Sequence, residues 1–341
     1  MKITTPIAFL FSILAISCNQ GKNIPDISSI HVDLPVERFE KDFYAMDSNN
    51  LEAGMPGLQQ KYPALLPIFI QNIIGATDSN GIRSFLHLNR PVFEDVEKKF
   101  PNIDRVKSGI EEGLRFTKFY FPTYRVPAAI KTLVGPPDAL AQMANGEQTP
   151  DFLGPDFIGI SLQFYLGKEY KIYNDEYFIT NVAPQYRSRR FEKEYIPADV
   201  MKLIADDVYP DRSSGKPLIT QIIEKGKQWY LLDHLMPRTA DTLKTGYTKK
   251  QLDWCDKYEG LIWNKIIAED LYTVEPVTIQ TYIGEAPFTQ TLGNDSPGNL
   301  GQWVGWQIVK KFASGNPEMT LADILKTPTE KMLEGAKYKP K

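Results

Sequence analysis

Histidine and cysteine are scarce in this chain, which has three His and two Cys among 341 residues. Zinc sites and Cys–His nucleophile pairs depend on these side chains. His31, His87 and His234 stand far apart in the sequence. An H-E-x-x-H zinc helix needs two imidazoles one turn apart on one helix face, so the sequence excludes it. We therefore expect no bound metal and no other cofactor.

A strong net charge is also missing. The chain has 39 Lys+Arg against 42 Asp+Glu, a formal charge of −3. Without a strong positive field, nucleic acid is not an expected partner. The phosphate-binding patterns G-x-x-x-x-G-K-[ST] and G-x-G-x-x-G are absent as well, so no nucleotide is expected.

No apolar run is long enough to cross a membrane. The longest stretch near the N-terminus, Ile7–Ile16, falls well short of the roughly 20 residues of a membrane helix. Its length is typical of a signal-peptide core. Ala15 and Ser17 are small and stand directly before Cys18, which resembles a bacterial lipobox. The alternative is a plain secretion signal followed by an incidental cysteine.

The lipobox predicts a signal peptide over 1–17 and an acylated N-terminus at Cys18. Several acyl chains hold a protein at a membrane without a spanning helix, because each buried methylene contributes roughly 0.8 kcal/mol. Residues 18–30 are mostly polar and predict a flexible tether. Cys255 is then the remaining cysteine, so no disulfide within the chain is expected.

Residues 31–341 contain no convincing linker and no repeat, and they predict one compact, helix-rich α+β domain. Strands are expected within Ile30–Phe43, Tyr124–Val134 and Phe157–Leu166. The apolar run from Pro63 to Gly75 predicts a core helix. Further helices are expected from Pro197 to Val208, Pro217 to Leu235, Thr248 to Ile266 and Gly301 to Phe312, with two short helices beginning at Thr320 and Thr327.

Two local patterns are more specific. Thr248, three residues before Gln251, is typical of a capping box at a helix start. Gly301 and Gly305 lie four residues apart, which permits close packing of another backbone. Carboxylate pairs are plentiful, but sequence alone does not place two of them across a cleft, as glycoside hydrolysis requires.

Several motifs together resemble one family. They are the Cys18 lipobox and the segments Val36–Phe43, Pro217–Lys227, Gly301–Phe312 and Tyr338–Pro340. In this order they resemble the gliding motility lipoproteins of the GldB family of Bacteroidota. The resemblance implies a role in gliding and the associated protein secretion, at the cell envelope. It also implies an anchor facing the periplasm, since no acidic run follows Cys18.

That family is similar in layout to predicted zinc proteases. In those relatives a strand precedes an H-E-x-x-H helix, and a later helix carries Glu-Gly-x-Ala with a third metal ligand. Here the helix around Asp206 has no His, and the later helix has Glu224 one place early and Lys227 in place of Ala. The resemblance therefore implies a degenerate zincin-type scaffold with no catalytic residue and no metal.

The function expected is a non-enzymatic, membrane-anchored component of the gliding machinery that binds partner proteins or peptides. The candidate groove residues are Tyr195, Asp206, Glu224, Lys227 and Tyr230. The alternative is that these five are ordinary helix-face residues. Two other functions stay open: a hydrolase with an unrecognised carboxylate or metal site, and a passive peptidoglycan- or glycan-binding module.

Overall fold

The computed structural model describes residues 24–143 and 148–340. The predicted signal peptide, Cys18 and the first part of the predicted tether lie outside the described residues, so those predictions stay open. Ile27, within the last part of the predicted tether, is buried. Within the described ranges, we find no helix with the length and apolar content that a bilayer crossing requires.

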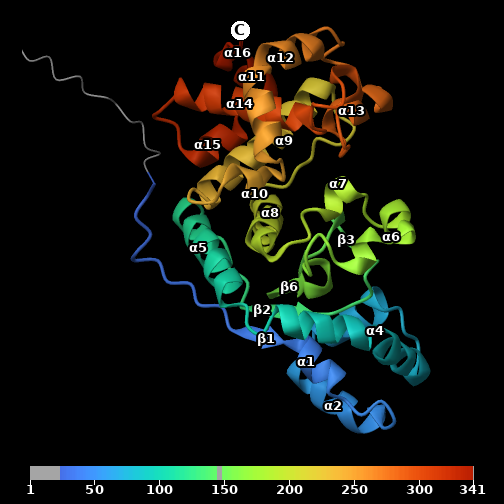
Figure 1. Cartoon of the computed structure of the whole chain (residues 1–341). Coiled ribbons are helices and arrows are strands. Elements are labelled where there is room, and N and C mark those ends of the chain that lie inside the picture. Colours follow the sequence, from blue (N-terminus) through green and yellow to red (C-terminus); the bar gives the residue numbers. More distant parts are fainter. Residues whose placement is uncertain (1–23, 144–147, 341) are drawn as a thin grey trace, which may run out of the picture.

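A small mixed sheet lies in the lower half of the molecule (Figure 1). Its strand order is β1-β2-β6-β5, with β1–β2 and β2–β6 parallel and β5–β6 antiparallel. Both central strands are buried along their whole length, because helices cover parallel strands on both faces. A separate pair joins β3 to β4. The bounds are β1 (Val36–Arg38), β2 (Ala129–Leu133), β3 (Ala141–Gln142), β4 (Gln148–Thr149), β5 (Phe152–Leu153) and β6 (Phe157–Ser161).

The helices that pack around this sheet form the sheet lobe, which we define as the described residues up to 216. They are α1 (Phe39–Tyr44), α2 (Leu51–Lys61), α3 (Leu65–Pro67), α4 (Ser79–Lys99), α5 (Asp104–Tyr120), α6 (Glu176–Asn181), α7 (Gln185–Ser188) and α8 (Ile196–Val208). The short α3 continues into a π-helical turn, Ile68–Ile73. Aromatic rings fill the centre of this core, where Phe39, Phe43 and Phe69 contact one another edge to face or tilted.

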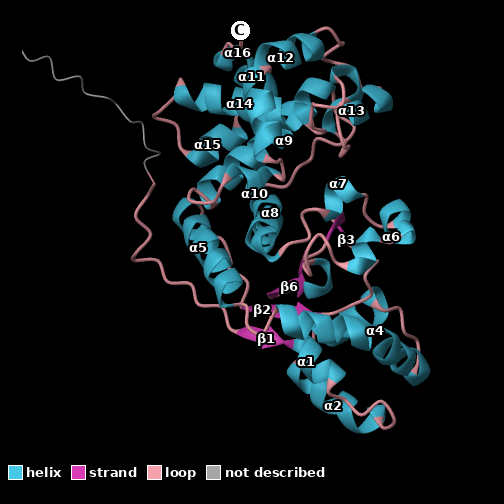
Figure 2. Ribbon diagram, viewed as in Figure 1, coloured by secondary structure: helices cyan, strands magenta, loops and turns pink. Residues whose placement is uncertain are grey.

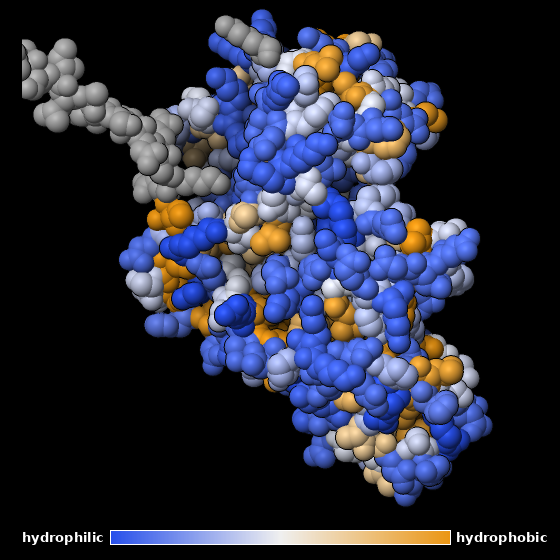
Figure 3. Space-filling view, in the orientation of Figure 1, coloured by the Kyte–Doolittle hydropathy of each residue, from blue (hydrophilic) through white to orange (hydrophobic). Residues whose placement is uncertain are grey.

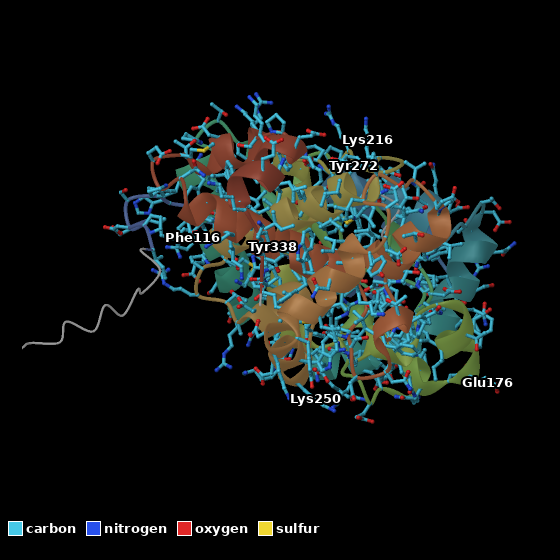
Figure 4. The ribbon with its side chains drawn as sticks, turned by 90° about the horizontal axis from the view of Figure 1, so that it is seen from above. Phe116, Glu176, Lys216, Lys250, Tyr272 and Tyr338 are labelled. Carbon is cyan, nitrogen blue, oxygen red and sulfur yellow. The ribbon has the colours of Figure 1, made fainter. Side chains whose placement is uncertain are left out.

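The remaining helices form the helical lobe, residues 217–340, in the upper half of Figure 2. They are α9 (Leu218–Leu235), α10 (Asp241–Thr245), α11 (Lys249–Lys257), α12 (Glu259–Ile267), α13 (Pro276–Ile283), α14 (Leu300–Ser314), α15 (Leu321–Lys326) and α16 (Thr329–Ala336). The segment before α13 runs back beside the start of α9, where Leu218 N donates to Thr273 O. Figure 4 accordingly shows Tyr272 next to Lys216.

Helix α9 belongs to both hydrophobic cores. Its first half contributes Leu218 and Ile222 to the core of the helical lobe. Its last turns contribute Leu231 and Leu235 to the core around the sheet. The two lobes are therefore joined through α9 and also through α15, which contributes Leu325 to the core around the sheet and Ile324 to the other. The chain forms a single compact, helix-rich α+β domain as predicted.

The predicted close packing at the glycines is confirmed. A methyl group built on Gly305 would lie 1.8 Å from the carbonyl oxygen of Ile222, and one on Gly226 would lie 2.1 Å from the carbonyl carbon of Gly305. Since Gly301 lies near Ile222 and Gly305 near Gly226, α9 and α14 run parallel. Their backbones meet at distances that any side chain would prevent.

Most predicted elements are present, but several end earlier than expected. The strand expected within Ile30–Phe43 has only three residues, because Phe39 begins α1. The strand from Phe157 ends at Ser161 and becomes a 3-10 turn. The helix from Thr248 has the predicted capping box but breaks at Tyr258 into α11 and α12.

The face seen in Figure 3 is covered mainly by hydrophilic side chains, with apolar ones gathered beside α5. Phe119, near the end of α5, leaves 43% of its surface exposed. Single exposed aromatic side chains of this kind are normal on water-facing surfaces.

Candidate functional site

A cleft of about 600 Å³ lies between the two lobes. We call it the inter-lobe cleft. Its walls come from β3, β4, α7 and α8 of the sheet lobe and from α9, α10, α13 and α14 of the helical lobe. Its volume is in the range of pockets that hold small ligands or short polymer segments.

One face of α9 forms a wall of the cleft. The lining residues Gln221, Lys225, Gln228, Trp229 and Leu232 recur every three or four positions, which places them on one side of a helix. Trp229 is partly exposed and contacts the rings of Tyr247 and Trp306, with centroids 5.6 and 5.9 Å away. This spacing is visible in the sequence and identifies the cleft face of α9. The predicted groove residues do not follow it.

A second wall comes from α8. Pro197 stands in its first turn, where a missing N–H costs nothing. Asp199, Lys202 and Asp206 line the cleft from this helix. Lys202 Nζ lies 2.9 Å from Asp199 Oδ1, so this wall carries an ion pair rather than two separate charges.

Arginines of the loop around α7 join the lobes across the cleft. Arg187 Nη1 donates to Gln148 Oε1 at 2.7 Å, and its Nε lies 3.5 Å from Glu285 Oε2. Arg190 also donates to Glu285, just after α13. Figure 1 shows α7 facing α13 in agreement with these pairs. Burial opposes ionisation of Glu285, but Arg190 and Arg187 hold its pKa below the usual value.

The other cations of the cleft are also paired. Lys225 Nζ lies 3.1 Å from Asp211 Oδ2, and Lys244 contacts Asp233. Although burial raises the pKa of Asp211, Lys225 outweighs it and the pKa lies below the ordinary value. The lysines and arginines of the walls therefore each have a carboxylate partner within the protein.

A buried carboxyl group lies behind the α8 wall. Tyr165 donates its hydroxyl to Asp151 Oδ2 at 2.6 Å and lies 3.3 Å from Asp199 Oδ2. Burial raises the pKa of Asp151 to about 8, and the nearby Asp199 charge adds to the shift. Asp151 is therefore mostly protonated at neutral pH, one tyrosine away from the cleft.

The five predicted groove residues do not line one surface. Asp206 alone lines the cleft. Glu224 and Lys227 lie on another face of α9 and form an ion pair of 2.7 Å. Lys227 is buried and also donates to Thr327 O at 2.8 Å, before α16. The pair therefore connects α9 to the C-terminal helices. It does not face the cleft, because successive residues of a helix are rotated by 100° and these two lie on another side of α9.

The two predicted groove tyrosines lie elsewhere. Tyr230 packs on His234, with ring centroids 4.5 Å apart, and burial raises its pKa to about 12. Tyr195 is half-buried in the turn before α8, where burial raises its pKa. Neither lines the cleft. A binding role for these tyrosines, Glu224 and Lys227 stays a prediction.

Metal ligands are not grouped in the described part of the chain: no three His, Cys, Asp or Glu side chains are placed to hold an ion. His31 is exposed, His87 lies on α4, and His234 Nδ1 bonds to Tyr230 O at 2.9 Å. Cys255 is buried, and burial raises the pKa of its thiol.

Fold and site together define a two-lobed, helix-rich α+β protein with a polar cleft between its lobes. A protein-family comparison matches residues 20–340 to gliding motility protein GldB. The chain therefore belongs to the GldB family of gliding motility lipoproteins, as the sequence motifs predicted. This family is associated with the cell envelope. No curated protein and no solved structure matches the chain, so the predicted zincin-type layout stays a prediction.

Proposed function

We propose that this protein is a non-enzymatic component of the gliding machinery and its associated protein secretion, working by binding. In this proposal acyl chains on Cys18 hold it at a membrane, facing the periplasm, and other proteins of the machinery are its partners. Family membership supports the gliding and lipoprotein parts. The inter-lobe cleft is the proposed ligand site.

The observation that carries the binding role is the pairing of charge inside the cleft. Arg187 and Arg190 share Glu285, and Lys202 pairs with Asp199. A group that attacks a substrate or transfers its proton has to reach the substrate. A wall whose cations are already neutralised is suited to holding a ligand rather than to transforming it.

The test is to fill the cleft without disturbing the fold. Ser214 lines the cleft and is exposed, so Ser214→Trp adds a large ring to open space. We expect this variant to reach normal levels in the membrane but to lower cell gliding. Ser314→Trp, at the exposed end of α14, is the matched control and leaves gliding unchanged. Normal gliding with Ser214→Trp would contradict the proposal.

One observation favours a second candidate, an acid–base hydrolase. Asp151 keeps its proton at neutral pH and is linked through Tyr165 to Asp199 in the cleft wall. A raised carboxyl pKa beside a cleft is characteristic of general acids. Against it, Asp151 is fully buried and has no surface for a substrate. Peptide or glycan cleavage by purified protein, abolished by Asp151→Asn, would establish this candidate in place of the first.

A further inference from the structure

The hydrogen-bonding groups that the cleft leaves for a ligand are mainly uncharged amides and hydroxyls, including the buried Ser213 Oγ, which no described residue bonds. Gln221 Nε2 donates to Lys216 O at 2.7 Å, and Gln302 Nε2 donates to Ile283 O at 3.2 Å. Gln228 Nε2 donates in the same way to Tyr209 O. A main-chain carbonyl bonds only to the NH₂ end of an amide, so each glutamine is fixed with its oxygen as the remaining acceptor.

Asn299 adds a further acceptor, and an unusual one. It precedes α14 and lines the cleft, but its side chain does not cap the helix. Its Oδ1 atom is buried, and no donor among the described residues bonds to it. Its backbone has φ 56°, in the left-handed region that costs a non-glycine residue free energy. An unsatisfied buried oxygen on a strained backbone is the kind of feature that a bound ligand compensates.

The charges of the cleft point to an uncharged ligand. A charged ligand would have to compete with the Arg190–Glu285 or Lys225–Asp211 pair for its counter-ion. A neutral ligand leaves these pairs intact. One N–H of each of three wall glutamines is already bonded to a main-chain carbonyl, so each amide leaves its oxygen and its second N–H, which together match ligand groups that both donate and accept, as hydroxyls do.

Trp229 supplies an apolar surface beside these acceptors. Its indole is partly exposed and is held between Tyr247 and Trp306. Aromatic faces carry partial negative charge and attract C–H groups. A sugar ring has such C–H groups on its face and hydroxyl donors around its rim.

We propose that the inter-lobe cleft binds a neutral oligosaccharide, with its hydroxyl groups donating to Asn299 and the glutamine oxygens and a ring face on Trp229. The inference rests on the proposed function, in which the cleft holds a ligand without cleaving it. It adds a ligand class: the protein would connect the gliding machinery to an uncharged glycan. A cleft of about 600 Å³ accommodates a short stretch of such a chain.

The experiment is calorimetric titration of the full-length mature protein in detergent with cellotetraose, chitotetraose and tetragalacturonate. We expect saturable binding of at least one neutral tetrasaccharide with Kd of about 1 mM or lower. The acidic tetrasaccharide, which would have to disturb the ion pairs, binds at least ~10-fold more weakly. Trp229→Ala weakens neutral binding by ~10-fold or more. Trp254→Ala, on α11 outside the cleft, leaves it unchanged.

A second pair of variants separates binding from folding. Asn299→Gly removes both the strained side chain and the acceptor, so it weakens sugar binding while the melting temperature stays equal or rises. Lys337→Gly relieves the other positive φ at a non-glycine position of the described residues, 45°, away from the cleft, and leaves binding unchanged. No saturable binding of either neutral sugar, or equal losses in Trp229→Ala and Trp254→Ala, would overturn the inference.

The same experiment distinguishes the two proposals. If neither neutral sugar binds but Ser214→Trp still lowers gliding, the ligand class is wrong and the binding role stands. If the sugar binds and new reducing ends appear, the cleft cleaves its ligand, and the non-enzymatic role is wrong.

Discussion

Gly226 of α9 and Gly305 of α14 bring two parallel helices into backbone contact. Their backbones approach so closely that a methyl group on Gly226 would lie 2.1 Å from the carbonyl carbon of Gly305. Trp229, three residues after Gly226, and Trp306, directly after Gly305, then meet with centroids 5.9 Å apart. The glycine contact therefore helps to position the aromatic side chain that faces the cleft.

Gly305→Ala tests this contact. Its new methyl would lie 1.8 Å from Ile222 O, and backbone cannot yield as a flexible side chain does. We expect the free energy of unfolding to fall by about 3 kcal/mol or more, measured by urea denaturation. Gly57→Ala, in α2 with no atom within 4 Å of the new methyl, is the control and leaves stability equal or higher. Equal effects of the two substitutions would refute close packing.

Lys227 and Glu224 provide a test of the predicted groove. Lys227→Met leaves Glu224 without its ammonium partner in a mostly buried position, so we expect a loss of about 3 kcal/mol in urea denaturation. Adding Glu224→Gln to the same protein should recover part of that loss, because no lone charge remains. If Lys227→Met instead left stability unchanged but lowered gliding, these residues would act in binding after all.

Asp151 predicts a pH dependence of stability. Its pKa is about 8 when folded and about 3.9 when unfolded. The stability it contributes is fully present below about pH 4 and is lost as the pH rises through 8. The difference in unfolding free energy between the protein and Asp151→Asn should shift in favour of the variant by roughly 4 kcal/mol from pH 5 to pH 8.

Urea denaturation at both pH values measures this shift. The lowered pKa values of Glu285 and Asp211 act in the opposite sense and in a separate, more acidic range, because those carboxylates stabilise the fold until they are protonated. Parallel pH profiles for the protein and Asp151→Asn would show that Asp151 titrates normally.

Cys18 predicts how the protein is held at the envelope. Cys18→Ala removes the site of acylation, so we expect the protein to move from the membrane fraction to the soluble fraction and cell gliding to be lost. Immunoblots of fractionated cells measure the first effect. Cys255→Ala is the matched control and leaves the fractionation unchanged. Membrane retention of Cys18→Ala would remove the lipid tether from the account.

Local signals in the sequence predicted local structure well. Thr248 and Thr320 both cap their helices with the side-chain pattern that the capping box requires. Gly301 and Gly305 predicted close packing, since few other reasons place two glycines four apart in a helix. Each of these signals depends on residues within one or two turns of one another.

The cleft depends on contacts that the sequence does not display. Arg190 meets Glu285 across 95 residues, and nothing in either segment identifies the other. The prediction of Glu224 and Lys227 as groove residues rested on a family resemblance. The cleft face of α9 is indicated instead by the spacing of Gln221, Lys225 and Gln228. On a helix, an error of one or two positions rotates a side chain by 100–200° around the axis. Here that rotation separates the residues that line the cleft from the buried ion pair of Glu224 and Lys227.

Because α9 contributes its first turns to one core and its last turns to the other, the core of the sheet lobe is incomplete without residues of the helical lobe. A protease cut between the lobes would leave α9 whole in the helical fragment and would take Leu231 and Leu235 away from the core of the sheet fragment. We therefore expect heat to melt the whole body in one cooperative step. A force applied to one lobe would be transmitted through α9 to the other lobe. This property is consistent with membership of the gliding motility family.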